Sequence, residues 1–379
     1  MENLLVNKVA AVKEVRQAAE YQKKKQACIL TGLAGSSKPV FFAAADKLLG
    51  GKGSMAFITA SREEIRTYRR ELNYLYPDLP MQELYPVSLP RVQADTQSLE
   101  LQAGRAAALR FLSGDERGIV FITAEALQQK QLRPSGMSGK ALQLAVGEEH
   151  EQRNIAVALL DLGYERTEQV DALGQFCLRG DILDVYPINS STAVRIEWFD
   201  NELDAMRSFD VDTQRSLQTL TSIKIAPLKV DESFSYDADI FEYCAADTMV
   251  VVDEPVHVFS MLEKLDKENK EHASELFGKQ ELIEQLAANG AVLVSALGHS
   301  YLQQLPSLNI PVRAVAPYNK NTNLLVEDLQ NWLAEGITPL IMLSGSIKAR
   351  GFADNLRNYG LKGAHFFPKK DALSRESSM

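Results

Sequence analysis

The feature that most constrains this chain is a region of two-residue alternation between Gly163 and Pro227. In Val194–Asp200, every second side chain from Val194 to Trp198 is apolar, and the residues between them are charged. Successive side chains of a strand point to opposite faces of a sheet, so this pattern predicts a half-buried strand. The segment Gly174–Pro187 alternates in the same way. The two segments together predict a sheet with one face against a core.

The outer face of this predicted sheet carries Arg179, Arg195 and Phe199 if the apolar side chains face the core. Exposed arginine beside an exposed aromatic residue is the composition of a protein-binding hot spot. The alternative is that Phe199 packs under a neighbouring loop and that the arginines pair with local carboxylates. Because alternation places all three outside, replacing each is expected to leave stability within about 0.5 kcal/mol of the wild type.

The amino-acid sequence of this region is similar to that of two bacterial repair proteins. Three motifs follow one another: Gly-x-Phe-x-x-Arg-Gly-x-Ile-Leu-Asp-Val-x-Pro from Gly174, Arg-Ile-Glu-x-Phe from Arg195, and Phe-Asp-x-x-Thr-Gln-Arg-Ser from Phe209. They resemble the second domain of bacterial transcription-repair coupling factors, and the corresponding domain of the excinuclease protein UvrB is similar too. The resemblance implies that this module docks the excinuclease protein UvrA. It also implies that Arg179, Arg195 and Phe199 make the contact.

The composition is that of a globular chain with several domains: of 379 residues, 45% are hydrophobic and 24% are charged. The net charge of −9 disfavours a dedicated DNA-binding surface, which needs clustered lysine and arginine. Cys28, Cys177 and Cys244 are widely spaced, as expected of reduced thiols in the cytoplasm. Since no segment approaches 18 uninterrupted apolar residues, no membrane span is expected, and we expect a cytoplasmic location.

Short apolar runs, each flanked by helical patterns, lie on both sides of the alternating region. Those before it are Ala27–Leu30, Met55–Thr59 and Ile119–Ile122, and those after it are Thr248–Asp253 and Ala291–Val294. Such alternation of buried strands with helices predicts a parallel α/β sheet.

Helices are expected over residues 1–25, Ala43–Leu49 and Asp95–Leu112. A further helix should begin after Ser61, because Ser61 and Glu64 have the spacing of a capping box.

The predicted fold class is therefore α/β: a degenerate P-loop-like parallel sheet domain, interrupted by an α+β interaction domain and followed by part of a further small α/β domain. The interaction domain is expected to contain one helix, Ile155–Leu162, and Arg133–Gly139 is a plausible linker to it. The last part should contain a helix, a strand and a helix, namely Leu324–Ala334, Leu340–Leu343 and Ser346–Tyr359. The predicted boundaries are 1–135 for the first part of the α/β domain, 136–230 for the interaction domain, 231–315 for the second part of the α/β domain, and 316–379 for the partial third domain with a polar tail.

A loop beginning at Gly32 lies where UvrB carries its phosphate-binding loop. A working loop has the pattern G-x-x-x-x-G-K-[ST], in which the glycine amides and the lysine hold phosphates and the hydroxyl binds magnesium. Here Gly32, Gly35 and Lys38 are present, but Ser37 replaces the second glycine and Pro39 replaces the hydroxyl residue. Because proline offers neither a magnesium ligand nor an N–H, we expect the loop to be vestigial, with no ATP or magnesium cofactor. The alternative is residual ATP binding through Lys38.

Asp253 and Glu254 resemble the acidic end of a magnesium-binding strand. Without a working phosphate loop, they are expected to cap the helix that follows. The five histidines show no metal-ligand spacing and the cysteines form no C-x-x-C pair, so neither a metal site nor a catalytic site is predicted. Relative to UvrB, the segment Pro86–Asp95 is too short for a DNA-gripping hairpin and has no aromatic residue.

The leading hypothesis is a non-catalytic adaptor of a transcription-repair coupling factor that binds UvrA and so recruits nucleotide excision repair to stalled RNA polymerase. RNA polymerase and DNA would be engaged through the ATP-dependent translocase motor and other domains of the full-length family, which are not expected here. The alternative is an active ATP-binding helicase or translocase fragment. A third possibility is a truncation product without function.

Overall fold

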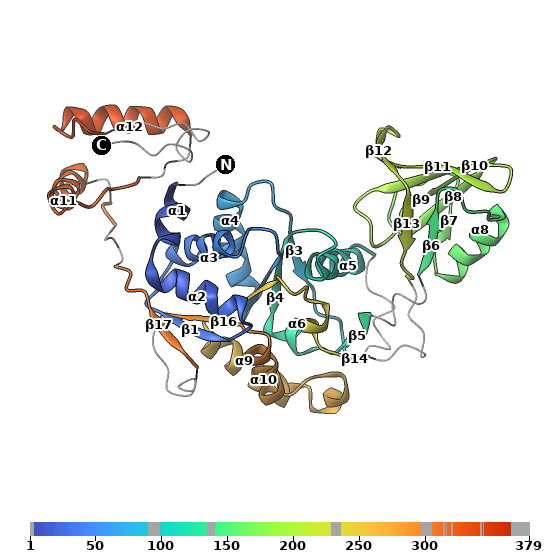
Figure 1. The fold of residues 1–379 in the computed structure, drawn as a ribbon, viewed down its shortest axis with the longest axis horizontal. Coiled ribbons are helices and arrows are strands. Elements are labelled where there is room, and N and C mark those ends of the chain that lie inside the picture. Colours follow the sequence, from blue (N-terminus) through green and yellow to red (C-terminus); the bar gives the residue numbers. More distant parts are fainter. Residues whose placement is uncertain are drawn as a thin grey trace.

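The computed structural model of this chain contains two large sheets, one in an α/β domain and one in an insert within it, besides two two-stranded pairs (Figure 1). The structure describes residues 4–89, 99–134, 141–228, 236–296, 305–313, 315, 317–319, 321–341, 343 and 345–364. Among these residues, no helix combines the length and the apolar character needed to cross a bilayer.

The larger sheet has seven strands, and every pairing in it is parallel. Parallel sheets are covered on both faces, which explains why its central strands are apolar at nearly every position. The predicted parallel α/β sheet is confirmed, with strands from both sides of the insert. In spatial order the strands are β17 (Ser307–Asn309), β1 (Cys28–Thr31), β16 (Val292–Ser295), β15 (Met249–Asp253), β2 (Met55–Thr59), β4 (Ile119–Thr123) and β3 (Met81–Leu84).

Helices cover both faces of this sheet and bury two apolar clusters against it. One face packs against α1 (Leu4–Ala10), α2 (Lys13–Lys23), α3 (Ser37–Leu48) and α4 (Arg62–Leu75). The other face packs against α5 (Leu99–Ser113), α6 (Ala124–Gln128), α9 (Pro255–Glu268) and α10 (Lys279–Ala288).

The helices of the first face differ in part from those predicted. The single helix expected over residues 1–25 is broken at Ala11 and Val12, so that α1 can turn and lie against α3. Helix α3 begins at Ser37, six residues before the expected Ala43, because Pro39 fits in a first helical turn. The capping box of α4 is confirmed: the Glu64 carboxylate accepts the Ser61 N–H at 3.2 Å.

The insert forms its own six-stranded mixed sheet, in which only the pairing of β7 with β8 is parallel. A two-stranded ribbon of β6 (Leu142–Ala145) with β13 (Ser222–Ile225) and the helix α8 (Gln152–Asp161) pack on one face of it. The spatial order of the strands is β12 (Ser216–Leu220), β11 (Glu202–Phe209), β10 (Ala193–Phe199), β9 (Ile182–Val185), β8 (Gln175–Arg179) and β7 (Glu165–Arg166).

The predicted alternation in the insert is confirmed on its core face, where Val194, Ile196 and Trp198 are buried. The opposite face is less open than the alternation suggests. Cys177, which we expected on the outside, is 2% exposed in a small second cluster with Phe209.

Short elements link the insert to the α/β domain. Strand β5 (Gln131–Leu132) precedes the insert and pairs antiparallel with β14 (Tyr236–Ala238), which follows it. Two 3-10 helices, η2 (Ile240–Tyr243) and η3 (Lys270–Glu275), lie in the part of the α/β domain that follows the insert. The predicted linker begins directly after β5, and its residues 135–139 lie outside the described residues, as do Asp95 and the polar tail from Lys369.

The last part of the described chain contains two helices, α11 (Thr322–Ala334) and α12 (Ser346–Asn358), as predicted, which pack through a small apolar cluster. The strand expected between them is wrong at the described positions Leu340, Ile341 and Leu343, which are in no strand and are 40–51% exposed. Since a strand exists only through pairing, an apolar run without a neighbouring strand stays irregular.

Candidate functional site

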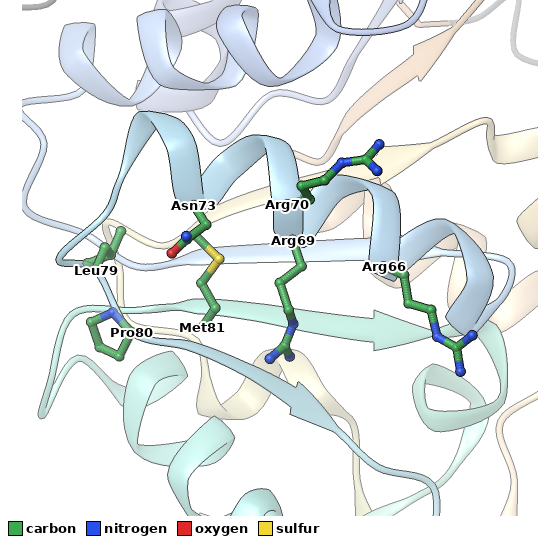
Figure 2. A pocket seen from close by; sticks show the side chains of 7 residues that line it. All are labelled: Arg66, Arg69, Arg70, Asn73, Leu79, Pro80 and Met81. Atoms are coloured by element: carbon green, nitrogen blue, oxygen red, sulfur yellow. The ribbon is translucent and has the colours of Figure 1, made fainter. Parts of the chain in front are cut away.

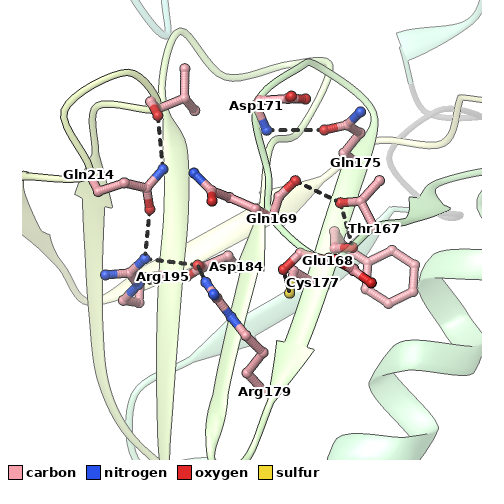
Figure 3. Close-up of polar contacts among 12 residues, drawn as sticks. Thr167, Glu168, Gln169, Asp171, Gln175, Cys177, Arg179, Asp184, Arg195 and Gln214 are labelled. Atoms are coloured by element: carbon pink, nitrogen blue, oxygen red, sulfur yellow. Dashed lines mark hydrogen bonds and ion pairs between the residues drawn. The ribbon is translucent and has the colours of Figure 1, made fainter.

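The three site residues predicted in the insert come from two strands that flank β9. Arg179 ends β8, and Arg195 and Phe199 lie on β10. The register of β9 places Asp184 directly across from Arg195 on one side and from Cys177 on the other. An acidic residue therefore separates the two arginines, as Figure 3 shows.

Asp184 is the centre of the polar contacts on this face. Its side chain is 2% exposed, and its two carboxylate oxygens accept hydrogen bonds from Arg195 Nε at 2.7 Å and Nη2 at 2.8 Å. Arg179 Nη2 donates to the same carboxylate at 3.4 Å. A carboxylate so far from water is stable only when it is paired, and a bidentate arginine is its best partner.

Further contacts fix the Arg195 side chain, which is 19% exposed. Gln214 accepts a hydrogen bond from Arg195 Nη2 at 3.2 Å, and the guanidinium lies 4.7 Å from the centre of the Phe209 ring. The hydrogen bond to Asp184 raises the pKa of Arg195, against the opposing effect of burial. Arg195 is therefore a cation whose side chain is held by Asp184, Gln214 and Phe209 and is only partly open to solvent.

Phe199 and Arg179 are much more open to solvent. Phe199 is 73% exposed at the end of β10, so it does not pack under a loop. The Arg179 side chain is 55% exposed, and Ile182, which lies opposite Arg179 in the register, is 36% exposed. We call Arg179, Ile182, Arg195 and Phe199 the arginine–phenylalanine face. The alternative interpretation of the sequence is therefore wrong for Phe199, which is exposed, and right for the arginines, which share one local carboxylate.

A loop restricts the open part of this face to the Arg179 side. Cys177 Sγ donates to the carbonyl oxygen of Glu168 at 2.9 Å, and the Gln175 side chain accepts the N–H of Asp171 (Figure 3). The Gln175 side chain also accepts the N–H of Ala172. The loop that begins after β7 is thereby held over Cys177.

Asp184 and Gln214 are the residues that the sequence interpretation missed. The usable signal for Asp184 was an acidic residue between two apolar ones, Leu183 and Val185, in a strand next to two arginines. Gln214 lies in the third motif, but the motif does not indicate its contact with Arg195; its backbone has a left-handed φ of 59° in the turn before β12.

In the second predicted site, the loop that we expected to be vestigial, an ion triad holds the lysine. Lys38 Nζ lies 2.6 Å from Asp253 Oδ1 and 2.8 Å from Glu254 Oε1. The two carboxylates raise the pKa of Lys38 despite its burial, which acts in the opposite direction. Although burial also opposes it, the contact with Lys38 lowers the pKa of Glu254. The predicted helix-capping role of these carboxylates is wrong: Glu254 precedes α9 but makes no capping hydrogen bond, because Lys38 and the N–H of Ala296 engage its side chain.

The backbone of this loop is also engaged within the protein. The N–H of Ala34 donates to Ser37 Oγ at 3.0 Å, and the N–H of Lys38 donates to the carbonyl oxygen of Gly35. Gly32 has a φ of +86°, and a Cβ there would lie 2.6 Å from the carbonyl oxygen of Ile310. This glycine therefore has a packing role, and the Ala34 and Lys38 amides are already hydrogen-bonded.

Comparison with known proteins gives these features a family context. Residues 142–230 match the family described as the UvrB interaction domain. The chain is 36% identical over 203 residues to the transcription-repair-coupling factor of Bacillus subtilis, covering 53% of this chain and 17% of that protein. It is 28% identical over 165 residues to the factor of Escherichia coli, covering 44% of this chain and 14% of that protein. It is 32% identical over 202 residues to the factor of Staphylococcus haemolyticus, covering 53% of this chain and 17% of that protein. The aligned region thus spans 14–17% of the length of these relatives.

Proposed function

We propose, from the kinship of about half of this chain with transcription-repair coupling factors, that it is their adaptor region and binds UvrA. In this role it would recruit nucleotide excision repair to a stalled RNA polymerase in the cytoplasm. Contacts with RNA polymerase and DNA, and the ATP-driven motor, would belong to other parts of such a factor.

The observation that carries this proposal is the arginine–phenylalanine face. Phe199 presents an apolar ring that is 73% exposed, beside an open Arg179 and a fixed Arg195. The residues of a binding hot spot are typically aromatic residues and arginines. A side chain that is already fixed before binding loses little conformational entropy on association. Phe199 would enter an apolar pocket of the partner, and the arginines would donate to its carboxylates or carbonyl groups.

Calorimetric titration of the chain against UvrA tests this proposal. We expect Phe199→Ala to weaken binding by about 2 kcal/mol or more, typical of a central hot spot. Leu160→Ala is the matched control, because Leu160 is 50% exposed on α8, which packs on the opposite face of the sheet. Equal affinities for wild type and Phe199→Ala, or an equal loss with Leu160→Ala, would exclude this face as the contact.

For the nucleotide loop we propose that the chain neither binds nor hydrolyses ATP. The proposal is supported by the ion triad of Lys38, Asp253 and Glu254 and by the engaged amides of the loop. True binding at a hundred times the dissociation constant would stabilise the fold by about 2.7 kcal/mol, which a thermal melt detects. A melting shift with ATP and magnesium that Lys38→Ala abolishes would instead favour the ATP-binding alternative.

A further inference from the structure

A basic groove lies on the α/β domain, between α4 and the start of the edge strand β3. Its volume is about 560 Å³. Figure 2 shows Arg66 and Arg69 extending from α4 on the side of the sheet, with Asn73 and Met81 near one another at the other end. The residues that line it are Arg66, Arg69, Arg70, Asn73, Leu79, Pro80 and Met81.

The charge of this groove is unbalanced. Three of the seven lining residues are arginines and none is acidic. In the part of the chain that the structure describes, no carboxylate lies within 4 Å of Arg66, Arg69 or Arg70, although Glu63 is one helical turn before Arg66. By contrast, Arg62 on the same helix pairs with Glu83.

The spacing of these arginines is unfavourable for the helix itself. Arg66 has Arg69 and Arg70 at the i+3 and i+4 positions, where like charges lie close together and repel. No carboxylate among the described residues pairs with these three arginines to offset the repulsion. An anionic ligand would balance it.

One end of the groove is apolar and is lined by Leu79, Pro80 and Met81 (Figure 2). Farther along α4, the Arg69 guanidinium lies 5.5 Å from the centre of the Phe121 ring. This contact holds Arg69 in place against β4. The groove also follows β3, the last strand in the sheet order, so no further strand of the sheet flanks it among the described residues.

We propose that this groove binds an acidic segment of a partner protein, an extended peptide in which carboxylates alternate with apolar side chains. The carboxylates would pair with Arg66 and Arg69, which extend on the side of β3, and the apolar side chains would cover Met81 and Leu79 (Figure 2). Charge complementarity supports an anionic occupant, and the apolar end of the groove favours a peptide over a nucleic acid. A phosphate backbone is usually bound by a broad basic surface, whereas only three of the seven residues that line this groove are basic.

This inference does not rest on the proposed function, because the groove lies in the seven-stranded sheet and the arginine–phenylalanine face in the insert. The groove variants described below should bind UvrA like the wild type unless that protein supplies the acidic segment. In that case the loss of affinity for UvrA with a groove variant should add to the loss of affinity with Phe199→Ala.

The test uses the full chain and a short fluorescein-labelled peptide of alternating glutamate and leucine, with a peptide of alternating glutamine and leucine as the uncharged control. Fluorescence anisotropy at low salt should show binding of the glutamate peptide at least about tenfold tighter than binding of the glutamine peptide, since each charge-assisted contact is worth about that factor. Added salt should weaken it.

Two variants address the groove directly. Arg66→Glu reverses one exposed charge, and Arg69→Met removes a second while keeping an unbranched apolar side chain over Phe121. Each should weaken binding of the glutamate peptide by about tenfold or more without lowering the melting temperature. Arg153→Glu is the matched control, because it makes the same charge reversal at an exposed position on α8.

Three results would overturn the proposal. One is equal affinity for the two peptides, and another is an equal effect of Arg153→Glu and Arg66→Glu. The third is duplex DNA of matched charge binding more tightly than the peptide and losing that affinity with Arg66→Glu, which would identify a nucleic-acid site instead.

Discussion

At the scale of single residues, the contacts of Asp184 determine how the arginine–phenylalanine face can work. Its buried carboxylate holds Arg195 in a bidentate pair and reaches Arg179 at 3.4 Å. The two arginines are thus fixed in different degrees, one almost enclosed and one largely in solvent. The more buried a member of this group is, the more its replacement should lower the stability of the fold.

We expect Asp184→Asn to lower both stability and affinity for UvrA, although Asp184 itself is too buried to touch a partner. The amide has one acceptor oxygen and no charge, so Arg195 loses its bidentate partner. Breaking a buried pair costs roughly 3–5 kcal/mol. Urea unfolding and calorimetric titration measure the two effects. Asp204→Asn, an exposed change on β11, serves as control, and unchanged affinity with Asp184→Asn would show that Arg195 needs no positioning.

The two arginines should differ when each is replaced by alanine. Arg179→Ala should weaken the complex by about 2 kcal/mol while leaving stability within about 0.5 kcal/mol, because its side chain is 55% exposed. Arg195→Ala should weaken the complex and also destabilise the fold, since it leaves Asp184 buried without its main partner. The expectation from alternation that all three positions tolerate alanine thus needs revision at Arg195. Thermal melts of Arg179→Ala and Arg195→Ala measure the difference in stability. Trp198→Ala is a core control that is expected to cost roughly 3–5 kcal/mol. Equal melting temperatures of the two arginine variants would contradict the prediction.

At the scale of elements, the sequence predicts the parts that have a strong local signal. The apolar strands β2, β4 and β15 and the capping box of α4 have local causes, and so they could be predicted. The edge strand β3 could not: its sequence Met-Gln-Glu-Leu has no strand pattern, and only pairing with β4 makes it a strand. At the site, alternation places Phe199 outside, while the pairing of Arg195 with Asp184 depends on a register between strands that no single segment contains.

The ion triad of Lys38, Asp253 and Glu254 connects α3 to the end of β15, so Lys38→Met should destabilise the α/β domain. It leaves Asp253 buried without its cation, which costs roughly 3–5 kcal/mol. Lys264→Met, which removes an exposed lysine 3.7 Å from Glu268, should change stability by no more than about 1 kcal/mol. Chemical denaturation of both variants measures the difference, and equal effects would show that the triad is dispensable.

The same triad predicts the pH dependence of that difference. The pKa of Glu254 is lowered in the fold, so its contribution is present above the ordinary value of 4.5 and is lost as pH falls through the lowered folded pKa. The pKa of Lys38 is raised, so its contribution is present below 10.5 and is lost only as pH rises through the raised value. The gap in stability between wild type and Lys38→Met should therefore be fully present at alkaline pH below 10.5 and should shrink as pH falls into acid, where protonation also relieves the unpaired carboxylates of the variant. A gap that widens in acid would contradict this.

At the scale of the whole molecule, the insert has its own apolar core, separate from the two clusters that cover the seven-stranded sheet. We therefore expect residues 141–228 alone to fold cooperatively and to bind UvrA with nearly the affinity of the full chain. Circular dichroism melts and calorimetric titration test this, with Phe199→Ala in the isolated insert as the negative control. An isolated insert that folds but does not bind would place part of the contact in the α/β domain.

The position of β1 in its sheet has a consequence for how the protein is made. Strand β1 lies between β16 and β17, so its two neighbours are translated long after it, whereas the insert is complete once Ile225 has left the ribosome. At about 5–20 residues per second, β1 waits on the order of tens of seconds for a partner. During synthesis the insert can therefore reach its native form first, while the domain that carries it is still an open sheet and a natural client for chaperones.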